Sequence, residues 1–334
     1  MSLVSVYKCG SRKGNIVKCL DMVKSSLYEM IRAKNSPTLF IKVNTVDVNF
    51  PDSITHPDAL EIVVRYFYDM FDKIIIGDNS AAFREGGNNP YSALKEKYDK
   101  IEFSDLSSHA TKKIDFLLVN GEKTEVDVSM LPANAFTISL ALPKTHDSVV
   151  YTGCAKNMLG CVTSSRSMVH GVKGIKKIFL WNVANSHRIA HLNLVNLLMN
   201  VRADFNILDG FTGMEGNGPI FGESIELGVA MCSADAIALD TVASRMLGFT
   251  HVPYLHLAGK RGIGMSDIKL IEILYDGFEK WSDIAKKAQP HYLYRFQITT
   301  DVGSWPYIDY KLMWNVLKNF TKVKGKIAEQ LSGA

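Results

Sequence analysis

The chain has 334 residues, of which 47% are hydrophobic and 22% charged, and its net charge is +4. This length suits two lobes, or one large α/β domain with an insertion. The basic excess is small and no segment interleaves Lys and Arg with aromatic residues, so the composition argues against nucleic-acid binding.

No apolar run is long enough to span a bilayer, and the N-terminus lacks an apolar signal core. We therefore expect a cytoplasmic protein with no membrane partner. The five cysteines are odd in number, and no two of them have C-x-x-C spacing. This argues against a disulfide framework and a zinc ribbon, and we expect no iron–sulfur cluster in this chain.

The first hundred residues alternate between two patterns. Apolar runs at 3–7, 39–44 and 73–78 predict strands, and helical spacing at 16–31 and 60–71 predicts the helices between them. This alternation is typical of a parallel sheet with crossover helices.

The rest of the chain is less regular. Residues 101–130 predict antiparallel strands about a turn at Asn120-Gly121. Further elements are predicted in this order: a strand at 136–142, a loop at 161–174, a helix at 189–201, a short helix at 251–261, a strand at 269–274 and helices over 277–334.

We therefore expect an α/β fold of two intimately packed lobes, with mixed or parallel sheets and crossover helices. The expected division is an N-terminal α/β lobe at 1–130, a core lobe at 131–275 and a C-terminal helical extension at 276–334. A cleft between the lobes would hold the functional site.

The segment 206–248 carries the most distinctive pattern. It predicts a strand at 206–208, a glycine-rich loop from Asp209 to Gly222, a second strand at 225–232 and a helix starting near Asp235. Glycines let main-chain N–H groups approach a small ligand closely. The loop could instead be purely structural, with solvated acids.

Polar residues cluster at the predicted strand ends. Lys144 and His146 stand two apart and would share one face of a strand. Two lysines with a histidine suit a carboxylate or phosphate ligand, and His146 could move a proton near neutral pH. The alternative is a lysine–acid network that closes the lobes. The expected ligand-binding residues are Lys42, Asn44, Asp78, Lys156, Asn157, Gly216 and Gly218.

Carboxylate oxygens are suitable ligands for a divalent metal, and Asp209 and Asp240 are the candidate ligands. Asp240 could instead bond a neighbouring loop. His170 lies in the loop at 161–174 and is a further candidate for the catalytic set, as is Glu215.

Several linked motifs resemble the domain-of-unknown-function family 362 (DUF362) over roughly residues 38 to 265. The motifs are Lys144-Thr145-His146, Lys156-Asn157-x-x-Gly160, Asp209-Gly210-x-x-Gly213-Met214-Glu215-Gly216-Asn217-Gly218-Pro219, Ser233-x-Asp235-x-x-Ala238-x-Asp240, Lys42-x-Asn44, Thr55-His56-Pro57 and Gly77-Asp78. The resemblance implies a mostly prokaryotic, intracellular protein of unknown function. Many members carry an appended ferredoxin-like cysteine module, which this chain lacks. A distant similarity to lactate-racemase-type proteins is also noted.

Our leading hypothesis is an enzyme, of an isomerase or racemase type, that acts on a small anionic substrate by acid/base chemistry. Lys144 and the other lysines would hold the anion, His146 would be the acid or base, and Glu215 its counterpart. One alternative is a ferredoxin-linked oxidoreductase working with a partner ferredoxin or a bound cofactor. Another is a non-catalytic anion-binding protein.

Overall fold

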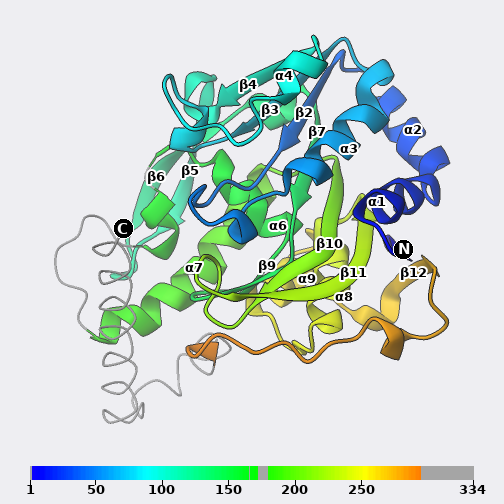
Figure 1. Ribbon diagram of the computed structural model, residues 1–334. Coiled ribbons are helices and arrows are strands. Elements are labelled where there is room, and N and C mark those ends of the chain that lie inside the picture. Colours follow the sequence, from blue (N-terminus) through cyan, green and yellow to red (C-terminus); the bar gives the residue numbers. More distant parts are fainter. Residues whose placement is uncertain (1, 165, 172–179, 295–334) are drawn as a thin grey trace, which may run out of the picture.

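One mixed sheet runs through the computed structural model, which describes residues 2–164, 166–171 and 180–294 (Figure 1). Its strands follow the order β12-β1-β11-β10-β7-β2-β3-β4, and β8 and β9 extend from β10. Their bounds are β1 Ser2–Lys8, β2 Thr38–Lys42, β3 Lys73–Asp78, β4 Ile101–Asp105, β7 Phe136–Ala141, β8 Lys144–His146, β9 Val150–Thr152, β10 Phe205–Glu215, β11 Glu223–Ser233 and β12 Ile271–Asp276.

Pairing is parallel from β10 through β7, β2 and β3 to β4, and also between β1 and β12. It is antiparallel where β11 joins β10 and β1. The expected α/β class with mixed sheets and crossover helices is thus confirmed. β4 corrects one expectation, because it joins the parallel sheet rather than an antiparallel group.

Helices cover both faces of the sheet (Figure 1). Strand residues alternate between two cores, as the two-residue period of a strand requires: Phe40 packs with one core, and Leu39 and Ile41 with the other. The helices packed with Leu39 and Ile41 are α1 Arg12–Asp21, α2 Lys24–Lys34 and α3 Pro57–Phe67. Those of the opposite core are α6 Cys154–Asn157, α7 Leu180–Asn200, α8 Ala236–Met246 and α9 Pro253–Lys260.

Smaller elements complete the fold. A separate hairpin joins β5 (Thr111–Leu117) to β6 (Lys123–Ser129), and Gly121 in its turn has φ 86°, so the turn predicted at Asn120-Gly121 is confirmed. Two one-turn helices are α4 Leu94–Lys97 and α5 Leu131–Asn134. The 3-10 turns are Pro51–Ser53, Tyr68–Met70, Ala81–Phe83, Leu106–Ser108, Met158–Cys161, Arg166–His170, Ile268–Leu270 and Trp281–Asp283.

The division expected near residue 130 falls between β6 and β7. β7 of the second expected lobe pairs with β2 of the first, so the two expected lobes share one sheet. A site formed by both lobes would therefore lie at the strand ends of this sheet. The helical extension expected after residue 276 is wrong for 277–293, where the structure describes no α-helix and the 3-10 turn Trp281–Asp283 is the named element. Residues 295–334 lie outside the described range. Within that range, no helix has the length and apolar character needed to cross a membrane.

The glycine-rich segment is more regular than predicted. β10 continues through Gly210 and Gly213 to Glu215, so only residues 216–222 connect it to β11. A Cβ on Gly213 would lie 2.8 Å from the Pro143 carbonyl oxygen. The prediction of a loop starting at Asp209 is therefore wrong for its first half, where glycine permits close strand packing and the backbone belongs to the sheet.

Gly213→Ala should lower the free energy of unfolding by about 1–3 kcal/mol, because overpacking forces the Pro143 backbone to move. Gly10→Ala is the matched control, since a Cβ there meets nothing within 4 Å. Urea unfolding of both variants tests this. Equal midpoints for the two would show that Gly213 has no packing role.

Candidate functional site

A small cavity of about 70 Å³ opens where the carboxyl ends of β2 and β3 meet β8 and α6. Ligand sites in open α/β sheets gather at the carboxyl ends of strands. Its lining residues are Lys42, Asn44, Val46, Asp78, Lys144, His146, Thr152, Lys156, Asn157, Leu159, Gly160 and Pro219. The structure therefore brings together seven of the residues that the sequence placed in one site.

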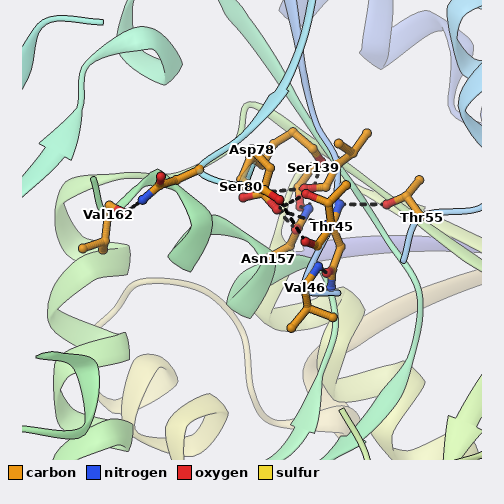
Figure 2. A network of polar contacts seen from close by, with 12 residues as sticks. Thr45, Val46, Thr55, Asp78, Ser80, Ser139, Asn157 and Val162 are labelled. Atoms are coloured by element: carbon orange, nitrogen blue, oxygen red, sulfur yellow. Dashed lines mark hydrogen bonds and ion pairs between the residues drawn. The ribbon is translucent and has the colours of Figure 1, made fainter. Parts of the chain in front are cut away.

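Lys42 and Asp78, at the ends of neighbouring strands, form a buried ion pair with Nζ and Oδ1 3.0 Å apart. The second carboxylate oxygen of Asp78 accepts bonds from the Thr45 backbone N–H at 3.0 Å and the Thr45 hydroxyl at 2.9 Å (Figure 2). Asn44 positions this turn, because its Oδ1 accepts the Val46 N–H at 3.1 Å. The charge of Lys42 is therefore already balanced inside the protein.

Asn157 connects this pair to α6. Its Nδ2 donates to the Lys42 carbonyl at 2.9 Å and to the Ser139 hydroxyl at 3.1 Å, and Figure 2 shows Ser139 and Asn157 beside Asp78. Gly160 lies against the ion pair, since a Cβ there would stand 2.2 Å from Asp78 Oδ1 and 2.5 Å from Lys42 Nζ. The motif Lys156-Asn157-x-x-Gly160 thus has a packing reason for its glycine.

Lys144 is the second buried lysine of the cavity wall, and it exposes none of its surface to water. Its amine donates to the Ser53 carbonyl at 2.5 Å. Across the part of the chain that the structure describes, Lys144 forms no ion pair with a carboxylate. Burial, together with the positive charge of Lys156, lowers the pKa of Lys144 to about 7, against an opposing effect of Asp78.

His146 is 6% exposed, and its Nδ1 accepts the Ser148 N–H at 3.0 Å. The same nitrogen lies 2.9 Å from Asp147 Oδ1, a contact that would favour a proton there. Burial and the positive charge of Lys156 outweigh this attraction and lower the pKa of His146 to about 3. His146 is therefore neutral at neutral pH.

His170 does not line the cavity, although it is close enough to His146 to lower the pKa of that imidazole. It ends the 3-10 turn Arg166–His170, where burial lowers its own pKa. His170 is therefore near the cavity without lining it.

The two glycines of the connecting loop also lie near the site without lining it. Gly218 donates its N–H to the Thr145 hydroxyl at 3.3 Å, and Pro219 beside it lines the cavity. The Gly216 N–H donates to the Gln289 carbonyl at 2.7 Å. The loop therefore borders the cavity, while its glycine N–H groups bond to other parts of the chain.

Of the four predicted carboxylates, Asp78 lines the cavity, and Glu215, Asp209 and Asp240 do not. Glu215 Oε2 accepts the Gln289 N–H at 2.7 Å, so this side chain fixes the C-terminal segment. Met214, its neighbour on β10, is the residue that pairs with Lys144. Because successive strand residues point to opposite faces, Glu215 points away from the position that Met214 occupies.

Asp209 and Asp240, the two candidate metal ligands, have separate partners. Asp209 pairs with Arg12 Nε of α1 at 2.9 Å. Asp240 accepts the N–H groups of Cys154 and Ala155, each at 2.9 Å, and so caps the start of α6. No group of three or more His, Cys, Asp or Glu residues among those described is placed to hold a metal ion. Burial raises the pKa of Asp240 to about 7.

Sequence reasoning missed several lining residues. Thr152 was not singled out because it faces Lys144 only through the β8–β9 pairing, which brings Lys144 opposite Thr152. Val46, Leu159 and Pro219 carry no chemical signal, although Leu159 and Pro219 lie inside quoted motifs. The available signal was the place of Leu159 at an unspecified position of Lys156-Asn157-x-x-Gly160 and of Pro219 directly after Gly218.

The fold and the site define a mixed α/β protein with a lysine-rich cavity at the strand ends. The chain belongs to the family described as "Domain of unknown function (DUF362)", whose model matches residues 39–245. It is 26% identical over 240 residues to the Thylakoid-associated protein sll1697 of Synechocystis sp., covering 70% of each chain.

Two solved structures have a weaker similarity. A structural-genomics protein from Thermotoga maritima has a TM-score of 0.41 at 10% identity, and the match covers 72% of this chain and 59% of that one. The lactate racemase apoprotein from Thermoanaerobacterium thermosaccharolyticum has a TM-score of 0.40 at 12% identity, over 74% of this chain and 58% of that one. The chain thus spans less than two thirds of either structure.

Lys42→Met should lower the free energy of unfolding by about 3–5 kcal/mol, because it leaves the buried Asp78 carboxylate without its cation. Lys42→Met/Asp78→Asn should be less destabilised than the sum of the two single changes, by about 1 kcal/mol or more. Denaturant unfolding of the three variants measures this coupling. Additive losses would mean that the pair does not interact.

Proposed function

We propose that the chain is an enzyme that binds a small carboxylate or phosphate in this cavity and moves a proton on it. The observation that carries the proposal is Lys144: a buried amine in the cavity wall, near Lys156, with no ion pair to any carboxylate among the described residues. A buried ammonium without a counter-ion is costly, and a bound anion would supply the missing charge.

The charge of the cavity favours an anion. Three of its lining residues are lysines, and Asp78 is the one lining residue with a carboxylate, which already balances Lys42. Lys144 and the half-buried Lys156 add positive charge to the same wall. Their amines can donate charge-assisted hydrogen bonds to carboxylate or phosphate oxygens.

Proton transfer is assigned to Lys144 rather than to His146. A general acid or base works best with a pKa near the working pH, and the pKa of Lys144 is about 7 whereas that of His146 is about 3. His146 then acts as a neutral hydrogen-bonding group. The contact of Glu215 with Gln289 supports no catalytic role for that carboxylate.

The size of the cavity limits the ligand. A water molecule needs roughly 10–15 Å³ of such volume, so 70 Å³ holds about five. A small organic acid or a phosphate group fits this space, and a whole nucleotide does not. The redox alternative with a ferredoxin partner, and the cytoplasmic location, remain predictions.

Sulfate tests the proposal, because it carries the same charge throughout neutral and mildly alkaline pH. Its affinity should be constant below pH 7 and fall as the pH rises through about 7, since only the protonated form of Lys144 attracts an anion. Lys144→Met and Lys156→Met should each weaken binding about tenfold or more at pH 6. Calorimetry with sulfate, at ionic strength fixed by chloride, measures this.

Lys95→Met is the control, because Lys95 is an exposed lysine that does not line the cavity. Equal sulfate affinity in Lys144→Met and Lys95→Met would contradict the proposed site. Sulfate binding without turnover of any small acid would leave the non-catalytic alternative standing in place of the enzyme.

A further inference from the structure

The two buried lysines of the cavity differ in one respect. Lys42 has Asp78 at 3.0 Å, whereas the Lys144 amine has the Ser53 carbonyl and the nearby charge of Lys156. A lysine becomes a nucleophile when it is desolvated or stands next to another cation, because both conditions favour the neutral amine. Lys144 meets both conditions, whereas Lys42 is equally buried but has the Asp78 carboxylate beside it, which favours the ammonium.

We propose that Lys144 attacks the carbonyl carbon of a small 2-oxo acid and forms an imine with it, while Lys156 holds the carboxylate. The inference rests on the proposed function, since it uses the same cavity and the same anionic class of ligand. It narrows that class to acids with a carbonyl next to the carboxylate.

The cavity suits such a molecule. Its volume of 70 Å³ matches an acid with about six non-hydrogen atoms, such as pyruvate, if each occupies about as much of this volume as a water, which needs roughly 10–15 Å³. Lys156 and Lys144 both line it, so one amine can hold the carboxylate while the other meets the neighbouring carbonyl carbon. Thr152, opposite Lys144 on β9, supplies a hydroxyl in the same wall.

The step balances without any further reagent. The nitrogen lone pair of the neutral amine forms the C–N bond, and the carbonyl oxygen takes up the electron pair of its π bond and a proton. The nitrogen then gives one of its two hydrogens to the hydroxyl, which leaves as water when the C–O bond breaks, and gives the other hydrogen to solvent as a proton. The nitrogen lone pair forms the second bond of the C=N group, which gives the imine. No electron is gained or lost overall.

One movement is required. The amine must leave the Ser53 carbonyl, to which it now donates, and turn toward the cavity. The four-carbon stem of lysine has the rotatable bonds for this change. The hydrogen bond to the Ser53 carbonyl must therefore break before the Lys144 amine can react.

The test is reduction of the protein with borohydride in the presence of pyruvate, followed by mass spectrometry of the intact chain and of its peptides. Reduction turns the imine into a stable secondary amine, so the chain should gain the mass of one pyruvic acid less one oxygen atom, on the peptide that carries Lys144. The yield should rise with pH through about 7, opposite to the sulfate affinity, because the neutral amine is the reactive form.

Variants locate each role. Lys144→Met should abolish the mass gain, and its circular dichroism should match the unchanged chain. Lys156→Gln should keep the mass gain but need about tenfold more pyruvate. Lys95→Met should react as the unchanged chain does. A pyruvate requirement unaltered in Lys156→Gln would overturn the assignment of Lys156.

The outcomes separate this inference from the proposed function. If pyruvate raises the melting temperature but no adduct forms, or if the adduct lies on another lysine, the nucleophile is refuted while the anion site stands. If neither pyruvate nor sulfate binds, both the inference and the proposed function fail.

Discussion

The candidate site depends on one electrostatic constraint: two lysines are buried in the same cavity wall, and within the described part of the chain only Lys42 forms an ion pair with a carboxylate. Lys42 is matched by Asp78 and becomes part of the framework. Lys144 is held by a backbone carbonyl and stands near Lys156, so its ammonium form is unfavourable there. Because the pKa of Lys144 is about 7, both protonation states are present at neutral pH. The ammonium form can bind an anion, and the neutral amine can use its lone pair as a nucleophile.

The rest of the fold holds that arrangement in place. The parallel strands β2 and β3 end side by side and deliver Lys42 and Asp78 together. Asp240 of α8 fixes the start of α6, which carries Lys156 and Asn157 to the cavity. Gly160 leaves room for the ion pair where any side chain would collide with it. The residues that stabilise this part of the fold therefore also position the residues of the proposed site.

The sequence predicted the strand ends well, because apolar runs that stop at polar residues are a local signal. It placed Lys42, Asp78 and Lys144 together correctly for that reason. The sequence also placed Glu215 in the cavity, which it does not line, because the glycines of β10 suggested a loop. Without knowing that Met214 and Glu215 lie on a strand, the sequence could not show that their side chains point to opposite faces. It also favoured His146 as the acid or base, since the burial that lowers an imidazole pKa is a property of tertiary packing.

The most direct measurement is the pKa of the Lys144 amine, followed by nuclear magnetic resonance of the chain labelled at lysine side chains. The account predicts a lysine signal with a midpoint near 7, against the ordinary lysine value of about 10.4, and this signal should be absent from Lys144→Met. If every lysine titrates near the ordinary value, Lys144 is an ordinary ammonium and the central claim is wrong.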